Sequence, residues 1–122
     1  MNKRKTYKTP EFLDDIASAQ WKARIKQLSE RGDIKPEDLT NLEIYCENYS
    51  IWRASMADLK KNGFNIVNSQ GTQSRNPALS AKADAEKVMI KMSSLLGFDP
   101  VSRRKNPVED DSTDQFDQIL TM

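Results

Sequence analysis

The chain has 122 residues, which suffice for one compact domain and are too few for two of ordinary size. It is 37% apolar and 30% charged, and no apolar run approaches the roughly 20 residues of a membrane-spanning helix. The net charge is +1 and histidine is absent. This composition excludes histidine-dependent catalysis and histidine metal sites, and it indicates a soluble, foldable chain.

The remaining composition favours a binding protein over an enzyme. The single cysteine, Cys46, cannot form an internal disulfide, and no apolar segment typical of a secretory signal follows the basic N-terminus. We therefore expect an intracellular protein. The four glycines form neither of the common phosphate-cradling motifs. Acidic pairs such as Asp14-Asp15 lie at expected helix starts, where the helix dipole explains them. We predict no catalytic residue, no metal and no cofactor.

Charge is distributed unevenly along the chain. Residues 1–105 hold 19 basic and 13 acidic side chains, a net +6, whereas residues 106–122 hold five acids and no base, a net −5. A basic body is typical of contact with a polyanion, although two solvated ends would give the same pattern. We divide the chain into a flexible basic arm (1–9), one helical domain (10–105) and a disordered acidic tail (106–122).

The first predicted element is a helix over about residues 10–31. Thr9 supplies a capping hydroxyl, Pro10 takes the first helical position, and Gly32 follows as a stop. Apolar residues then recur at steps of four and three, which places them on one helical face. They are Leu13, Ala17, Trp21, Ile25 and Leu28.

A long helix is predicted over about residues 36–62. Pro36 begins it, acids occupy its first turn, and Gly63 ends it after two lysines. Such a helix measures about 40 Å, whereas a domain of about 100 residues has a radius of gyration near 13 Å. Because the helix overshoots a compact domain, we expect part of its apolar stripe to pack against another copy of the chain. The residues predicted for this interface are Tyr45, Tyr49, Trp52, Met56 and Leu59.

A short β-hairpin is predicted near residues 64–76. Phe64, Ile66 and Val67 favour a strand, and the polar cluster Ser69–Thr72 is typical of a turn. Asn76-Pro77 then opens a third helix, which ends at Gly97. The predicted fold class is therefore mainly α, with three helices, one of them long, a short hairpin and the acidic tail.

Basic side chains gather in the arm, on the first helix and after the third helix. They are candidates for contacts to DNA phosphates, with ordinary solvated surface as the alternative of equal weight. The aromatic residues of the first two helices could stack on bases, but their helical spacing favours core or interface positions. No set of residues typical of base reading is present on a short helix. The candidate DNA contacts are Lys3, Arg4, Lys5, Lys8, Lys22, Arg24, Lys26, Arg103, Arg104 and Lys105.

Two sequence motifs, one in the second predicted helix and one at the end of the third, resemble those of a known family. Leu42 to Trp52 reads L-x-x-Y-C-x-x-Y-x-x-W, and Leu96 to Arg103 reads L-G-F-D-P-V-S-R. Trp21 precedes them in the first helix, and the polar hairpin lies between them. Together they resemble the small subunit of a tailed-phage terminase, over about residues 10–105.

The resemblance implies a non-enzymatic protein of the host cell cytoplasm. Such subunits assemble into rings, bind viral double-stranded DNA at the packaging-initiation site, and recruit and regulate the large subunit, which is the ATPase and nuclease. No family motif marks the DNA contacts, so the candidates above rest on charge alone. Within the acidic tail, the apolar residues Phe116, Ile119 and Leu120 are our candidate docking peptide for the large subunit.

A dimeric helix-turn-helix transcriptional regulator of a phage or bacterium is the alternative. The first helix, the link Gly32–Lys35 and the second helix could form such a motif. The second helix is, however, long for a recognition helix, and its exposed side lacks a base-reading set. The oligomeric state and the DNA footprint distinguish the two hypotheses.

Overall fold

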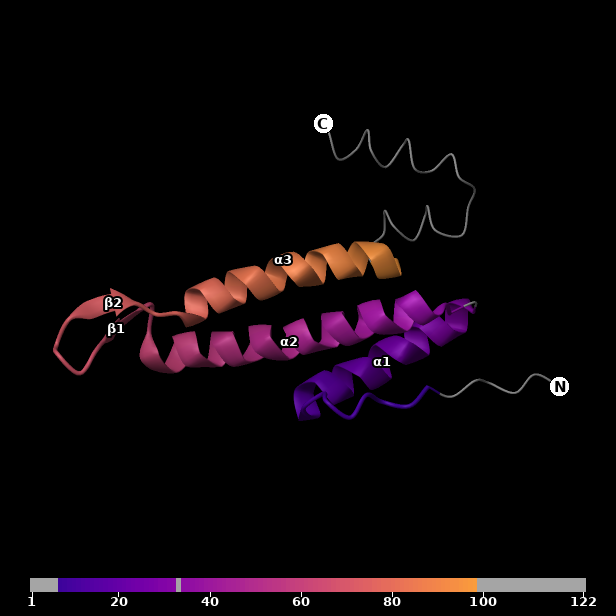
Figure 1. The fold of residues 1–122 in the computed structure, drawn as a ribbon, viewed down its shortest axis with the longest axis horizontal. Helices are drawn as coiled ribbons and strands as arrows, with labels where there is room; N and C mark the ends of the chain where they lie inside the picture. Colours follow the sequence, from indigo (N-terminus) through magenta and orange to yellow (C-terminus); the bar gives the residue numbers. More distant parts are fainter. Residues whose placement is uncertain (1–6, 33, 99–122) are drawn as a thin grey trace, which may run out of the picture.

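A computed structural model describes residues 7–32 and 34–98 (Figure 1). In chain order its elements are α1 (Asp15–Arg31), α2 (Pro36–Asn62), β1 (Asn65–Val67), β2 (Gln73–Arg75) and α3 (Ala78–Leu96). The predicted fold class is confirmed, and the long helix has the predicted bounds. The predicted acidic tail lies outside the described residues. No helix in the described ranges combines the length and apolar character needed to cross a membrane.

The helices form an elongated bundle in which α1 covers only part of α2 (Figure 1). Helix α3 runs back along α2, and α1 packs beside the part of α2 that is remote from the hairpin. Because α1 has 17 residues and α2 has 27, α1 leaves the C-terminal turns of α2 uncovered. The bundle thus has three helices at one end and two helices plus the hairpin at the other.

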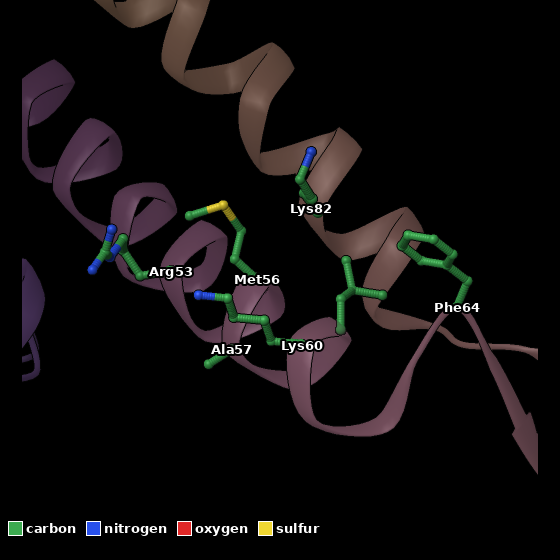
Figure 2. A pocket seen from close by; sticks show the side chains of 7 residues that line it. Arg53, Met56, Ala57, Lys60, Phe64 and Lys82 are labelled. Atoms are coloured by element: carbon green, nitrogen blue, oxygen red, sulfur yellow. The ribbon is translucent and has the colours of Figure 1, made fainter.

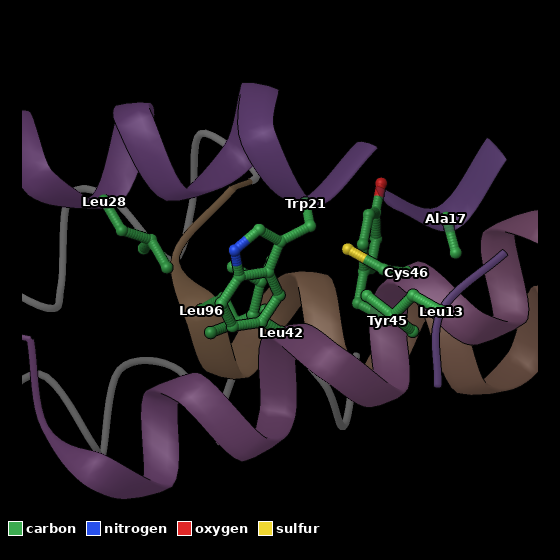
Figure 3. Packing of buried hydrophobic residues seen from close by; sticks show 8 residues of the cluster. All are labelled: Leu13, Ala17, Trp21, Leu28, Leu42, Tyr45, Cys46 and Leu96. Carbon is green, nitrogen blue, oxygen red and sulfur yellow. The ribbon is translucent and has the colours of Figure 1, made fainter. Parts of the chain in front are cut away.

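The core lies at the three-helix end (Figure 3). Its buried side chains come from all three helices and confirm the apolar face predicted for the first helix, with Ile25 packed against the cluster. Trp21 is only 2% exposed, so its assignment to the core is confirmed. Each large buried side chain contributes about 1.5–3 kcal/mol. The cluster is Leu13, Ala17, Trp21, Leu28, Leu42, Tyr45, Cys46 and Leu96.

The predicted start of the first helix near residue 10 is wrong, because α1 begins at Asp15. Asp14 is the N-cap, and its carboxylate accepts a hydrogen bond of 2.9 Å from a backbone amide of the first turn. The same carboxylate accepts a hydrogen bond from the Ser50 hydroxyl of α2. The helix therefore starts after Asp14, which is held by hydrogen bonds from its own helix and from α2, and not at the local start signal of Thr9 and Pro10.

Asn76 links the hairpin to α3. Its side chain is buried, donates to the carboxylate of Asp58 (2.8 Å) and to the carbonyl of Gly63 (2.9 Å), and accepts from the backbone of Ala78 (2.9 Å). The predicted opening of the third helix at Asn76-Pro77 is therefore confirmed to within one residue, with Pro77 at the cap position.

The hairpin is a two-stranded antiparallel ribbon in which Asn65 pairs with Arg75 and Val67 with Gln73. It lies within the predicted range and projects from the end of α2 (Figure 1). Gly97 closes α3 at the other end, at φ 73° and ψ 32°, a left-handed conformation that favours glycine.

Candidate nucleic-acid and subunit interfaces

Two of the predicted DNA contacts lie side by side on α1. Lys22 and Lys26 are exposed and stand one helical turn apart, away from the buried stripe that contains Trp21 and Leu28. Neither lysine forms an ion pair with another described residue. Their ammonium groups are therefore available to an anionic ligand.

Arg24 has a different environment from its two neighbours. Its guanidinium lies over the ring of Phe98 at 4.6 Å and over the ring of Tyr45 at 5.6 Å from the centroids. It also donates hydrogen bonds to Gln27 (2.9 Å) and to the Tyr45 hydroxyl (3.4 Å). Stacking on two aromatic rings orients Arg24 toward the core rather than toward a phosphate. No sequence pattern indicated this contact, because Phe98 comes from the far end of the domain.

The remaining DNA candidates fall into two groups. Lys8 forms an exposed ion pair with Glu11 at 3.3 Å, which contributes little to stability and leaves the lysine accessible. The others lie outside the described residues; they are Lys3, Arg4, Lys5, Arg103, Arg104 and Lys105.

The residues predicted for the subunit interface are mostly engaged within the chain. Tyr45 is buried, while Tyr49, Trp52, Met56 and Leu59 are half-buried. The indole of Trp52 donates to Glu86 of α3 at 2.9 Å. Because α3 packs along α2, part of this stripe is covered within the chain, and the four half-buried side chains keep some exposed area.

Other apolar side chains, which were not among the predicted interface residues, are more exposed. Ile44 and Ile51 of α2 are 37% and 41% exposed, and Ile90 and Leu95 of α3 are 71% and 53% exposed. Ile44 and Ile51 stand seven residues apart and share a face, about 200° around the helix from the buried Leu42. The heptad spacing of Ile44 and Ile51 could have predicted this exposed face. The aromatic stripe of the same helix was chosen as the interface instead.

A pocket opens between α2 and α3 near the hairpin (Figure 2). We call it the hairpin-end groove; it has a volume of about 530 Å³. It begins one turn beyond Ser50, where α1 meets α2, so α1 does not cover it. Its wall is mostly apolar and carries three cations. The lining residues are Arg53, Met56, Ala57, Leu59, Lys60, Phe64 and Lys82.

The described groups whose pKa values are shifted have structural explanations. Burial raises the pKa of the Cys46 thiol to about 12, which leaves it a poor nucleophile. The pKa of Asp14 is lowered mainly by the hydrogen bond from Ser50, and that of Glu86 mainly by the hydrogen bond from Lys82. Among the residues that the structure describes, no group of three or more His, Cys, Asp and Glu is arranged to hold a metal ion.

Comparison with known proteins identifies the family. The family model described as "Phage terminase, small subunit" matches residues 17–113. The chain belongs to this family. The match covers α2, the hairpin, α3 and nearly all of α1, so it includes Lys22, Lys26 and the residues predicted for the subunit interface. No curated protein and no solved structure matches the chain.

Membership in the terminase small-subunit family confirms the resemblance of the two sequence motifs. It also assigns the chain a general role in the packaging of phage DNA. The apolar residues of the acidic tail, Phe116, Ile119 and Leu120, lie beyond the matched range and outside the described residues.

Proposed function

We propose that the chain is a non-catalytic terminase small subunit of the host cytoplasm. In this proposal it assembles into a ring, binds viral double-stranded DNA at the packaging-initiation site, and recruits and regulates the large-subunit ATPase and nuclease. The observation that carries the proposal is the family match, which extends over nearly the whole helical domain. That match favours this role over the transcriptional regulator.

The DNA contact is proposed to include Lys22 and Lys26 of α1. Both are exposed and unpaired among the described residues, and a ring repeats them in every subunit. Contacts that are weak singly become strong when many subunits engage one duplex. In this proposal Arg24 does not contact DNA. It stabilises the position of α1 by stacking on Phe98 and Tyr45.

Charge reversal on α1 tests the DNA contact. In Lys22→Glu/Lys26→Glu we expect weaker binding to duplex DNA at low salt. We also expect a shallower dependence of affinity on salt, with the log–log slope reduced by about 0.9 for each phosphate that is no longer neutralised. Lys87→Glu/Lys91→Glu is a matched control, because these lysines are an exposed pair at the same spacing on α3. Equal affinity in both variants and the native chain would leave the α1 face as solvated surface.

Self-association is proposed to use α2. Tyr49, Trp52, Met56 and Leu59 retain some exposed area, and the more exposed Ile44 and Ile51 extend the apolar surface of this helix. Exposed apolar patches on a soluble domain mark interaction surfaces. Ile51→Glu is expected to reduce the mass of the assembly, whereas Ala23→Glu, an exposed position on α1, is expected to leave it unchanged. An unchanged mass in Ile51→Glu would place the interface elsewhere.

The large subunit is proposed to bind the tail through its apolar residues. The triple variant Phe116→Ala/Ile119→Ala/Leu120→Ala is expected to lose binding to the large subunit in a pull-down, and to keep its own assembly mass and DNA affinity. Binding that persists in the triple variant would refute this docking site.

A further inference from the structure

The hairpin-end groove continues, along α2 and α3, the place that α1 fills at the other end of the bundle. Over the first part of α2, α1 supplies a third apolar surface against α2 and α3. Beyond Ser50 that surface is missing, and Met56 and Leu59 form a half-exposed floor next to Phe64, which is 67% exposed. Figure 2 shows Met56 and Phe64 on the side of the groove where α2 and α3 face each other. The groove therefore fits a segment that supplies apolar side chains at helical or near-helical spacing.

The charge of the groove defines the segment further. Arg53, Lys60 and Lys82 line it and no acid does. Lys82 is paired with Glu86 at 2.7 Å, whereas Arg53 and Lys60 are exposed and have no ion pair with any other described residue. An occupant with carboxylates beside its apolar residues would pair with these two cations. A basic or neutral occupant would not.

We propose that the acidic segment 114–120 of this same chain occupies the hairpin-end groove. The segment carries Phe116, Ile119 and Leu120 at spacings of three and one, which places them on one side of a helical turn. Asp114 and Asp117 stand beside them, and residues 106–122 hold five acids and no base. Apolar side chains meet the floor of the groove, and the carboxylates meet Arg53 and Lys60.

The connecting chain has a length suited to this placement. The groove reaches Lys82, about 14 residues before the end of α3, which is about 21 Å along the helix. The 16 residue steps from Phe98 to Asp114 would span about 22 Å as a random coil and at most about 55 Å when extended. Because the linker can reach the groove without full extension, the effective concentration of the segment at its own groove is in the millimolar range of short linkers. This favours the groove of the same chain over that of a neighbour.

The inference goes beyond the proposed function and does not depend on it. It assigns Met56 and Leu59 to the tail and leaves self-association to the rest of the proposed surface of α2, including the exposed Ile44 and Ile51. It assigns a resting place to the segment in the isolated small subunit, whether or not the large subunit is its eventual partner. If the large subunit does bind this segment, it must first displace it from the groove.

Site-specific photo-crosslinking in the full chain tests the placement. Benzoylphenylalanine at position 116 keeps an aromatic ring there and reacts with nearby C–H bonds on irradiation. We expect crosslinks to Met56, Leu59 or Phe64, located by mass spectrometry of the digested chain. Mixing with isotopically heavy chain that lacks the photoreactive residue distinguishes crosslinks within one chain from crosslinks between chains.

Charge variants provide the matched comparison. Arg53→Glu/Lys60→Glu is expected to reduce the groove crosslink several-fold. Lys22→Glu/Lys26→Glu, which removes as many exposed cations from α1, is expected to leave it unchanged. Circular dichroism is the control, and both variants are expected to keep the helix content of the native chain. Crosslinks outside the groove, crosslinks only to the heavy chain, absence of crosslinks, or an equal yield in both variants would each overturn the proposal.

Discussion

Asn76 joins the end of α2 to the start of α3 through one buried amide. It connects Asp58 of α2, Gly63 after α2 and the first amide of α3. A net hydrogen bond contributes about 1 kcal/mol, and a buried group left unpaired costs about 1–3 kcal/mol. Asn76→Ala is therefore expected to lower the free energy of unfolding by about 2–3 kcal/mol in urea titration. Asn62→Ala, which loses one exposed hydrogen bond to Asp58, is expected to change it by less than about 0.5 kcal/mol.

Trp21 stabilises the fold through its buried apolar ring area and not through its indole N–H group. Its ring is almost wholly buried, while its Nε1 is buried without a hydrogen-bond partner among the described residues. Trp21→Ala is expected to cost about 3–5 kcal/mol of unfolding free energy because it leaves a cavity. Trp21→Phe removes an unsatisfied donor together with some area, so it is expected to cost much less. Equal losses in the two variants on chemical denaturation would contradict this assignment.

Three carboxylates connect stability to acid pH. Hydrogen bonds lower the pKa of Asp14, Asp58 and Glu86 from their ordinary values of 3.8 for Asp and 4.5 for Glu, the main donors being Ser50, Asn76 and Lys82. A lowered pKa in the folded state contributes stability that is fully present above the ordinary value and is lost as the pH falls toward the lowered one. The thermal midpoint is therefore expected to be level down to about pH 5 and to fall below it.

A variant checks the sign of this pH dependence. Ser50→Ala removes the main cause of the lowered pKa of Asp14. Its thermal midpoint is expected to lie below that of the native chain at pH 7, and the two are expected to converge in acid. A difference between them that grows as the pH falls would show that Ser50 does not stabilise the charged carboxylate.

Among the elements, α1 and α3 are joined at their C-terminal ends by Arg31. Its guanidinium donates to the carbonyls of Leu96 and Gly97, where α3 ends and its last carbonyls lack partners within the helix. A cation at this end also faces the negative end of the helix dipole. Arg31→Ala is expected to lower the free energy of unfolding by about 1–2 kcal/mol in chemical denaturation. Glu30→Ala, an exposed neighbour, is expected to change it by less than about 0.5 kcal/mol.

The elements themselves were largely predictable from local signals. Pro36 and Gly63 bound α2 as expected, and the hairpin follows the strand and turn residues after it. The start of α1 was not predictable, because the Asp14 cap is completed by Ser50 of another helix. Contacts between residues far apart in sequence, such as Arg31 to Gly97, cannot be predicted from the periodicity of the sequence.

The candidate site was less predictable than the fold. Helical spacing placed Lys22 and Lys26 away from the buried stripe, and both are exposed. Charge alone could not distinguish them from Arg24, whose partners Tyr45 and Phe98 lie elsewhere in the chain. The aromatic stripe of α2 was assigned to a subunit interface because its length was compared with that of a compact globule. The bundle is elongated, and α3 packs along α2, so these side chains are partly engaged within one chain while the interface itself stays a prediction.

In the molecule as a whole, the unequal lengths of the helices organise the proposed activities. Helix α1 closes the core at one end and presents lysines to solvent, while the other end is left with a groove that is apolar and basic. The five acids of residues 106–122 are complementary to that groove. The proposed DNA face and the proposed tail site therefore use different cations. Charge reversal on one is expected to change DNA affinity, and charge reversal on the other is expected to change the tail crosslink.

Ring assembly is the property on which the proposed role of this terminase small subunit depends, because a ring repeats every weak DNA contact. The absolute mass of the chain in solution measures it, by light scattering on a sizing column or by native mass spectrometry at micromolar concentration. We expect a closed species well above a tetramer with one defined mass. A monomer or a dimer at that concentration would contradict a preformed ring.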